Sequence, residues 1–179
     1  MQKKALLIAG ALAGIAAVSL LTSCRMQPKS AVVVKPFVLE KYLGKWYEIA
    51  RLDFRFEKNL NNTTAQYSMN SDGTVRVLNR GYNYKKGVWK EAIGKAKFRG
   101  AKDEAALKVS FWGPFYAGYN VIALDPAYSH ALIAGKNLDY LWILSRQPSI
   151  PEDVKAQYLH QAAQLGFDTS ALVWVGHSR

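Results

Sequence analysis

The sequence has a single cysteine among its 179 residues, and this scarcity excludes several kinds of site. An intramolecular disulfide cannot form, and a zinc or iron–sulfur centre held by several thiolates cannot be built. The three histidines, His130, His160 and His177, do not have the spacing of metal ligands. We therefore expect no metal and no other cofactor.

Motifs of nucleophilic enzymes are absent as well. The chain has no G-x-S-x-G elbow, and its one thiol, on Cys24, is the candidate for acylation described below. Glu48 and Asp53 are candidate buried acids, but their spacing alone does not make them catalytic. We expect a protein that is not an enzyme. Turnover of a lipid or a small apolar substrate is kept as a competing hypothesis.

Acidic residues are few relative to basic ones. The chain has 24 Lys and Arg against 13 Asp and Glu, and its net charge of +11 falls to +9 without Lys3 and Lys4 of the leader. No run of five or more like charges indicates a nucleic-acid-binding arm, so we expect no nucleic-acid partner. A basic protein favours anionic partners such as lipid head groups, although an ordinary solvated basic surface is the simpler interpretation.

The N-terminus has the pattern of a secretory signal. A short basic start precedes residues 5–21 (ALLIAGALAGIAAVSLL), which are uncharged and apolar. Leu21-Thr22-Ser23-Cys24 resembles a bacterial lipobox, in which the leader is cut before the Cys and the Cys is lipidated. The alternative is an uncleaved transmembrane anchor, for which this run is at the short end. By analogy with lipoprotein sorting, Arg25 in place of Asp favours the outer membrane, at its periplasmic face.

Three parts of the chain follow from this pattern. Residues 1–23 are the expected signal peptide, and residues 24–36 are the expected lipidated N-terminus and linker. Residues 25–36 reach at most about 40 Å when extended, so the linker would let the protein lie against the membrane or stand away from it. Residues 37–179 form the expected barrel domain.

The body of the chain alternates short hydrophobic runs with turn signals. Ser71-Asp72-Gly73 and Lys85-Lys86-Gly87 suit tight turns, and such short connections favour an antiparallel meander. Ser149-Ile150-Pro151-Glu152 resembles a capping box, and residues 154–165 then have helical spacing. We predict strands at 46–52, 63–70, 74–84, 88–98, 105–112, 117–124, 130–134 and 139–146, and a short final strand at 171–175.

Eight such strands can close into an all-β barrel that is wide enough for one small ligand. Faces with small residues leave room, and aromatic faces suit an acyl chain, while a few polar groups can orient a head group. For each position, plain core packing is the competing interpretation. The predicted lining positions are Ala92, Gly94, Ala96, Tyr116, Gly118, Asn120, Tyr140, Trp142 and Leu144.

Several motifs resemble those of the lipocalin family. Gly44-Lys45-Trp46 is similar to the G-x-W motif, and Leu144-Ser145-Arg146 is similar to the third motif, about 100 residues later. Asp125, followed by Tyr128, resembles a loosened second motif. Longer stretches are similar to the lipocalins of the bacterial outer membrane, and the resemblance covers roughly residues 37–175. These stretches are 46–51, 111–116, 119–125 and 140–146.

The resemblance implies an eight-stranded antiparallel up-and-down β-barrel with one C-terminal helix packed outside. It implies that Trp46 closes the barrel floor with Arg146 laid across it, and that Gly44, Trp46, Asp125 and Arg146 are structural. The bacterial members that this chain resembles are lipid carriers, so the resemblance implies a preference for fatty acids or lysophospholipids and a role in membrane maintenance under stress. Members can pair, so a homodimer is one expected state.

Beside the enzyme hypothesis, two functions without catalysis compete at this point. The first is a lipoprotein that stores or transports a single-tailed lipid in the barrel without breaking a bond. The second is an envelope interaction or scaffold protein whose barrel is filled and whose aromatic segment, residues 111–116, serves as a sticky surface. A barrel interior without a cavity larger than a few waters would favour the second.

Overall fold

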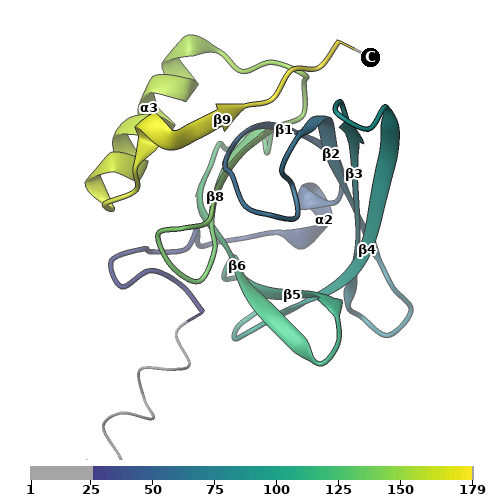
Figure 1. The fold of residues 1–179 in the computed structure, drawn as a ribbon. Coiled ribbons are helices and arrows are strands. Elements are labelled where there is room, and N and C mark those ends of the chain that lie inside the picture. Colours follow the sequence, from purple (N-terminus) through teal and green to yellow (C-terminus); the bar gives the residue numbers. More distant parts are fainter. Residues whose placement is uncertain (1–25, 179) are drawn as a thin grey trace, which may run out of the picture.

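Short connections join eight consecutive strands, which is why each strand lies antiparallel beside the next one in sequence. A computed structural model describes residues 26–178, so the leader and Cys24 lie outside the described residues (Figure 1). The strands are β1 (Gly44–Leu52), β2 (Leu60–Met69), β3 (Val75–Asn83), β4 (Val88–Phe98), β5 (Ala106–Trp112), β6 (Phe115–Leu124), β7 (His130–Ala134), β8 (Leu141–Ser145) and β9 (Leu172–Trp174). The helices are α2 (Leu39–Tyr42), α3 (Glu152–Gln164) and the short 3₁₀ helix η1 (Thr169–Ala171).

The strands close into a barrel because β1 pairs with both β2 and β8. Trp46 lies opposite Ala65 on one side, and Glu48 lies opposite Leu144 on the other. The end of β1 also pairs with β9, which extends the sheet outside the ring. The predicted eight-stranded antiparallel barrel with one C-terminal helix and an extra strand is therefore confirmed.

The predicted tight turns have the backbone geometry that glycine favours. Gly73 has φ of +77° and Gly87 has φ of +67°, both in the left-handed region. At the first turn, the Asn70 amide donates to the Thr74 carbonyl over 2.8 Å. These turns explain why β2 pairs with β3, and β3 with β4, in register over most of their length.

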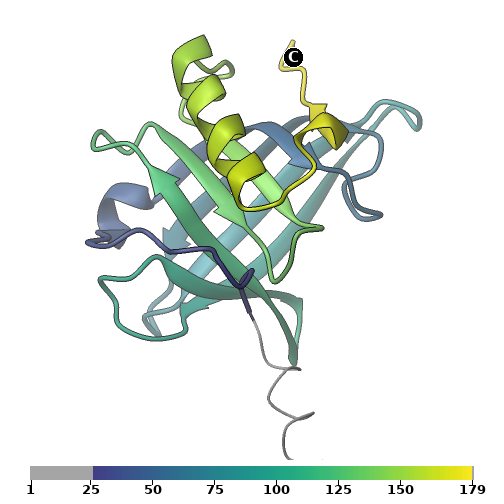
Figure 2. The same cartoon turned by 90° about the vertical axis from the view of Figure 1, so that its left-hand side faces the viewer.

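Two apolar cores form on the two faces of the sheet. The inner core fills the closed end of the barrel and includes Phe37, Trp46 and Val121. The outer core lies between the sheet and α3 and includes Leu132, Ile143 and Tyr158. Figure 2 shows α3 lying across the outside of the barrel wall. Because both faces of β7 and β8 are covered, these strands are apolar on both sides.

The start of α3 corrects one local prediction. The helix begins at Glu152 with Pro151 as its N-cap, and within residues 26–178 no side-chain hydrogen bond caps its first turn. The expected capping box at residues 149–152 therefore does not form. Pro151 has no side-chain acceptor to offer, and the acidic side chains of Glu152 and Asp153 instead complement the positive end of the helix dipole.

The N-terminal segment corrects another expectation. Residues 26–36 do not hang free as a linker but pack along the outside of the barrel, as the purple segment in Figure 2 shows. The Val34 amide donates to the Val121 carbonyl over 2.9 Å, and Ala31 is fully buried against the outer core. Ala31, Val33 and Val34 explain this docking, because leaving them in water would expose hydrophobic surface, whereas Val32 between them stays 78% exposed.

Candidate functional site

The barrel encloses a cavity of about 690 Å³ that opens at one end. Strands alternate their side chains between the two faces, so every second residue contributes to the wall. The wall is predominantly apolar and contains Ala65, Tyr67, Val75, Val77, Ala96, Leu107, Val109, Phe111, Trp142 and Leu144. A volume in the range of about 300–1,000 Å³ with such a lining is typical of a small-ligand site.

The closed end is sealed by stacked aromatic rings and one arginine. The Arg146 guanidinium carbon lies 3.9 Å from the centroid of the Trp46 ring, and the Trp46 indole N–H donates to the Tyr42 carbonyl over 2.8 Å. Arg146 also donates to the carbonyls of Lys41, Leu43, Lys45 and Tyr128. Trp46 and Arg146 therefore meet at the closed end of the barrel, in the arrangement that the lipocalin resemblance leads us to expect.

Gly44 and Asp125 fix the loops beside this floor. Gly44 has φ of +97°, and a Cβ there would lie 3.2 Å from an Arg146 nitrogen, so both the backbone and the close arginine favour glycine. The Asp125 carboxylate accepts from the backbone N–H groups of Ala127, Ser129 and His130. These contacts give both residues a structural role.

Three tyrosine hydroxyls form a chain at the bottom of the cavity. The Tyr119 hydroxyl lies 2.6 Å from that of Tyr42 and 2.8 Å from that of Tyr67. Burial raises the pKa of each of the three phenols, so all three stay neutral at physiological pH. The deepest polar groups of the cavity are therefore uncharged and already hydrogen-bonded to one another.

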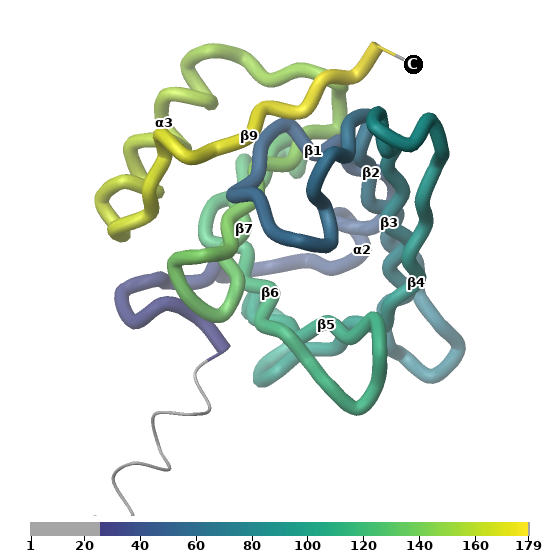
Figure 3. Tube along the Cα trace, in the orientation of Figure 1, coloured from purple at the N-terminus to yellow at the C-terminus, as the bar shows by residue number. Residues whose placement is uncertain are grey.

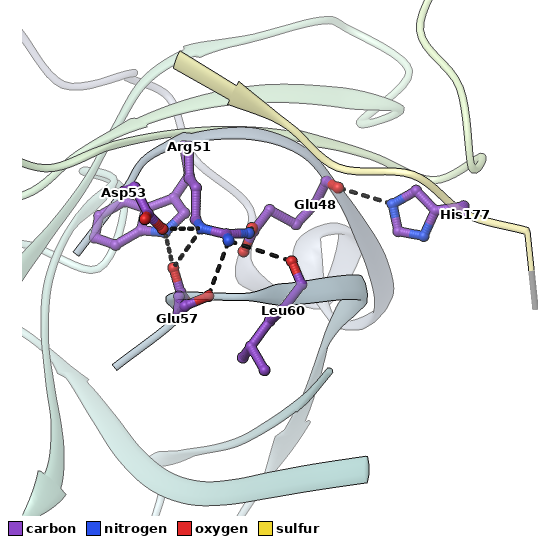
Figure 4. A network of polar contacts seen from close by, with 7 residues as sticks. Glu48, Arg51, Asp53, Glu57, Leu60 and His177 are labelled. Carbon is purple, nitrogen blue, oxygen red and sulfur yellow. Dashed lines mark hydrogen bonds and ion pairs between the residues drawn. The ribbon is translucent and has the colours of Figure 1, made fainter. Parts of the chain in front are cut away.

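A charged layer lies nearer the open end, around the fully buried side chain of Arg51 (Figure 4). A bulge in β1 between Glu48 and Ala50 shifts the alternation, which turns Arg51 toward the inside. The Arg51 guanidinium donates to Glu48 over 2.7 Å and to Asp53 over 3.2 Å, and it also binds the Glu57 carbonyl over 2.8 Å. The Glu57 carboxylate lies 3.9 Å from the Arg51 Nε, so three carboxylates surround one cation.

Burial determines the protonation of this layer. It raises the pKa of Glu48 well above its ordinary value, with repulsion from Glu57 adding to the effect and Arg51 opposing it. Burial also raises the pKa of Glu57, against the opposing hydrogen bond from the Trp142 indole N–H at 3.1 Å and the attraction of Arg51. Buried acids with raised pKa values make the cavity less negative than the number of carboxylates suggests.

The connection between β1 and β2 lies over the open end of the barrel, as Figure 3 shows. Its aromatic side chains contact the opposite walls: the Phe54 ring lies 5.9 Å from that of Trp142, and the Phe56 ring lies 5.3 Å from that of Trp112. The centroid of the Tyr140 ring lies 5.6 Å from that of Phe54. These side chains form an aromatic rim, defined as Phe54, Phe56, Trp112, Phe115 and Tyr140.

Polar atoms without partners also lie in the cavity wall. Among residues 26–178, Thr63 Oγ1 and Asn79 Oδ1 are buried and have no hydrogen-bond partner. Residues 26–178 hold no group of three or more His, Cys, Asp or Glu side chains arranged to bind a metal ion. They also include no helix with the length and hydrophobicity needed to cross a membrane.

The predicted lining positions fall into two groups. Six of them border the cavity: Ala96, Tyr116, Gly118, Tyr140, Trp142 and Leu144. Ala92, Gly94 and Asn120 do not border it. The Phe111 ring covers Gly94, where a Cβ would lie 2.9 Å from ring carbons, and Ala92 lies on the same face farther along β4.

On β6, the face shared by Tyr116, Gly118 and Asn120 points out of the barrel, although Tyr116 and Gly118 also border the cavity. The Asn120 side-chain amide donates to the Met26 carbonyl over 2.8 Å, and a Cβ on Gly118 would collide with that same carbonyl. The Tyr116 ring lies beneath Lys97 and Lys108 on the outer surface. The inward residues are therefore Ala117 and Tyr119, because side chains alternate along the strand.

Other cavity residues carried a weaker sequence signal and were missed. Val75 and Val77 follow period-two alternation in β3, which predicts one common face but not which side it points to. Phe54 and Phe56 lie in a loop, where two aromatic residues in the run DFRFEKN are unusual. The buried pair of Arg51 and Glu57 had no sequence signal, since the bulge that brings them together is a product of the barrel.

Comparison with known proteins adds to this geometry. A family model described as a lipocalin-like domain matches residues 37–177. The "Outer membrane lipoprotein Blc" of Escherichia coli (strain K12) is 55% identical over 148 residues, which cover 83% of this chain and 84% of that protein. Its namesake in Vibrio cholerae is 47% identical over 157 residues, covering 87% and 92%.

More distant proteins share the fold. "Temperature-induced lipocalin-1" of Arabidopsis thaliana is 40% identical over 155 residues, covering 82% of each chain. The solved structure of insecticyanin from the tobacco hornworm Manduca sexta has a TM-score of 0.67 with 21% identity, covering 84% of this chain and 86% of that one.

Proposed function

The chain belongs to the lipocalin family, and on that premise we propose that it stores or transports single-tailed lipids, fatty acids or lysophospholipids, for membrane maintenance, including under stress. The observation that carries the proposal is the apolar cavity of about 690 Å³, closed at one end by the Trp46 floor and open at the other. A cavity with one opening admits a tail end first and leaves the head group at the open end.

The tail is held by burial rather than by polar contacts. Each methylene that leaves water contributes about 0.8 kcal/mol, so an acyl chain laid against Val75, Val77 and Leu107 gains affinity with its length. The neutral tyrosine chain beneath them presents no charge to the end of the tail. This arrangement suits an unsubstituted hydrocarbon.

The head group would meet polar and charged atoms near the open end. Arg55 and Lys136 border the opening and suit a carboxylate or a phosphate. The unpartnered oxygens of Thr63 and Asn79 can accept a hydrogen bond from a hydroxyl or an amine, as a glycerol-based head group would offer. Both fatty acids and lysophospholipids have groups that fit these positions.

The protein is proposed to act at the outer membrane, held there by lipid on Cys24. Support comes from the lipobox and from the relatives whose names describe them as outer membrane lipoproteins. The periplasmic face follows by analogy with lipoprotein sorting, as argued from Arg25.

The competing functions are less well supported. A scaffold protein with a filled barrel is disfavoured by the size of the cavity. Catalysis by Glu48 and Asp53 is disfavoured because both carboxylates pair with the Arg51 guanidinium, which gives them a part in the charged layer that needs no reaction. Binding without bond breakage accounts for the site.

Direct analysis of bound lipid tests the proposal. Gently purified protein should release fatty acid or lysophospholipid in mass spectrometry, and a fluorescent fatty acid should bind and be displaced by unlabelled lipid. Protein that carries no acyl ligand and binds no fluorescent fatty acid would refute it. Hydrolysis of added lysophospholipid that is lost in Glu48→Gln would favour the enzyme hypothesis instead.

A further inference from the structure

The cavity wall presents two carboxylates to a ligand but not the arginine that pairs with them. Glu48 and Glu57 border the cavity, whereas Arg51 does not. The side chains of Glu48 and Glu57 are only 5% and 12% exposed, and that of Arg51 is 2% exposed. A head group that reaches the charged layer therefore meets the two acids and not the base.

The donors of Arg51 are directed at groups within the layer, as Figure 4 shows. Its Nε–H donates to Asp53 over 3.2 Å, and Nη1 donates to Glu48 over 2.7 Å. Nη2 donates to the carbonyls of Glu57 and Leu60 over 2.8 and 3.2 Å. These contacts commit Arg51 to the layer, so it is not placed to bind an anionic head group from the cavity.

The layer has an excess of negative charge when all of its groups are ionised, because three carboxylates face one guanidinium. The Glu57 carboxylate is held least closely. It lies 3.9 Å from the Arg51 Nε and accepts from the Trp142 indole N–H over 3.1 Å. Burial raises the pKa of both Glu48 and Glu57, and repulsion from Glu57 adds to the effect on Glu48. The pair is therefore able to take up a proton.

The cations that border the cavity act more weakly than these acids. Among residues 26–178, the charged side chains of the cavity wall are Glu48, Glu57, Arg55 and Lys136. Arg55 and Lys136 are exposed at the opening, where water and salt screen their attraction for a head group. The two acids are buried, where the effective dielectric constant is lower and a charge acts more strongly.

Two further titratable groups lie beside the layer. Burial raises the pKa of Tyr67, so its phenol stays neutral and does not alter the charge of the cavity at physiological pH. The His177 Nε2 lies 2.8 Å from the Glu48 carbonyl, in the C-terminal segment. His177 does not border the cavity, so it is the group to control for rather than a contact of the ligand.

We propose that Glu48 and Glu57 select the head group of the bound lipid by its charge. An uncharged head group is admitted independently of pH, and a cationic one is favoured while both acids are ionised. An anionic head group binds together with a proton, which passes from solvent to the pair. The proposal rests on the lipid-binding function proposed above and adds the residues that discriminate between ligands. Because the ligand and the proton are linked, each strengthens the binding of the other.

Amphiphiles that share one tail but differ in a fixed head-group charge test this selection. Dodecyl sulfate, dodecanol and dodecyltrimethylammonium do not titrate between about pH 5 and about pH 8, so only the protein changes its charge. Each displaces phenylnaphthylamine, an uncharged fluorescent dye, at concentrations below micelle formation. The parent protein is the full chain with Cys24→Ser, so that neither a membrane nor a detergent competes for the amphiphiles.

The three amphiphiles should respond differently as the pH falls from about 8 to about 5. The affinity for dodecyl sulfate should rise about tenfold, which is the change that uptake of one proton produces over about one pH unit. The affinity for dodecyltrimethylammonium should fall by about the same factor, and that for dodecanol should stay within about twofold.

Glu57→Gln should remove this response. The amide keeps the size of the side chain, and its oxygen can still accept from the Trp142 indole N–H. Without repulsion from Glu57, Glu48 stays ionised beside Arg51, so the affinity for dodecyl sulfate should no longer depend on pH over this range. At about pH 8 it should match the affinity of the parent protein at about pH 5. His177→Asn is the matched control and should keep the parent response.

Thermal unfolding checks that both variants fold, and the comparison of the three head groups in the parent protein decides the proposal if they do not. An affinity for dodecyl sulfate that does not change with pH, with dodecanol still bound, would overturn the charge selection alone. The same conclusion follows from a parent-like response in Glu57→Gln or from loss of the response in His177→Asn. Failure of both dodecanol and palmitate to displace the dye from the folded parent protein would instead overturn the proposed function.

Discussion

Replacing Ala96 with phenylalanine should shorten the cavity from its closed end. Ala96 is buried in the wall, where it lies opposite Val75 and Val109 in the neighbouring strands. Two residues farther along β4, the Phe98 ring lies 6.3 Å from that of Phe37 at the floor. A new phenyl ring at this depth would occupy the space that the end of a long tail needs.

The size of the effect follows from the hydrocarbon that the ring displaces. If the ring takes the place of about four methylenes at about 0.8 kcal/mol each, palmitate loses about 3 kcal/mol, or about two hundredfold in affinity. Laurate is four methylenes shorter than palmitate, so it does not need the deep end and should bind the variant and the wild type alike. The advantage of palmitate over laurate should therefore disappear in Ala96→Phe.

Displacement of a fluorescent fatty acid by each chain length measures this difference. Ile93→Phe is the matched control, because Ile93 is on the same strand but 59% exposed on the outer face. Thermal unfolding checks that both variants fold, since overpacking a wall can cost about 1–3 kcal/mol. A folded Ala96→Phe protein that still prefers palmitate as strongly as the wild type would refute the tail-down placement.

Three further predictions concern the floor, the charged layer and the anchor. Arg146→Met removes hydrogen bonds to four carbonyls and the contact with the Trp46 ring. This change should lower the free energy of unfolding, measured in urea, by about 3–5 kcal/mol. A loss below about 1 kcal/mol would contradict a structural role for the floor. Burial raises the folded-state pKa of Glu48 and Glu57, so the folded protein binds more protons than the unfolded one between the ordinary and the raised pKa values. These two groups therefore favour folding at acidic pH, and that contribution to stability is lost as the pH rises through the raised pKa values. Glu48→Gln should therefore flatten the fall in melting temperature above about pH 4.5, whereas a steeper fall would reverse the assigned direction. Cys24→Ser should move the protein from the membrane fraction to the soluble periplasm without changing its melting temperature, and unchanged membrane recovery would exclude lipid on this thiol as the anchor.

Local patterns were enough to predict most strands and the C-terminal helix. The turns at Gly73 and Gly87 need a left-handed backbone, which marks the ends of β2, β3 and β4 in the sequence itself. The capping box before α3 failed because the residue at the cap position is Pro151. A motif match predicts a cap only when the backbone reaches the position that the motif assumes.

The cavity was harder to predict than the strands that enclose it. Tyr140, Trp142 and Leu144 of β8 all border the cavity, whereas of the three positions predicted on β6 only Tyr116 and Gly118 do so, and the Asn120 side chain points outward to Met26. Both faces of β6 are covered: the inner face packs against the core inside the barrel, and the outer face packs against the N-terminal segment. Alternation then gives two similar faces, and a shift of one residue exchanges them.

The sequence by itself determined the order of the strands, the tight turns and the motif residues Trp46 and Arg146, because these depend on neighbours within a few residues or on a family pattern. Only the tertiary structure decided that Arg51 turns inward at a bulge, that Glu57 reaches it from a loop, and that Met26 is clamped on β6. Each of these contacts depends on closing the barrel, which brings together segments that are distant in the sequence. The local sequence of one segment does not predict which other segment it will contact. The size of the cavity has the same origin, since it is set by how β1 meets β2 and β8 rather than by any one strand.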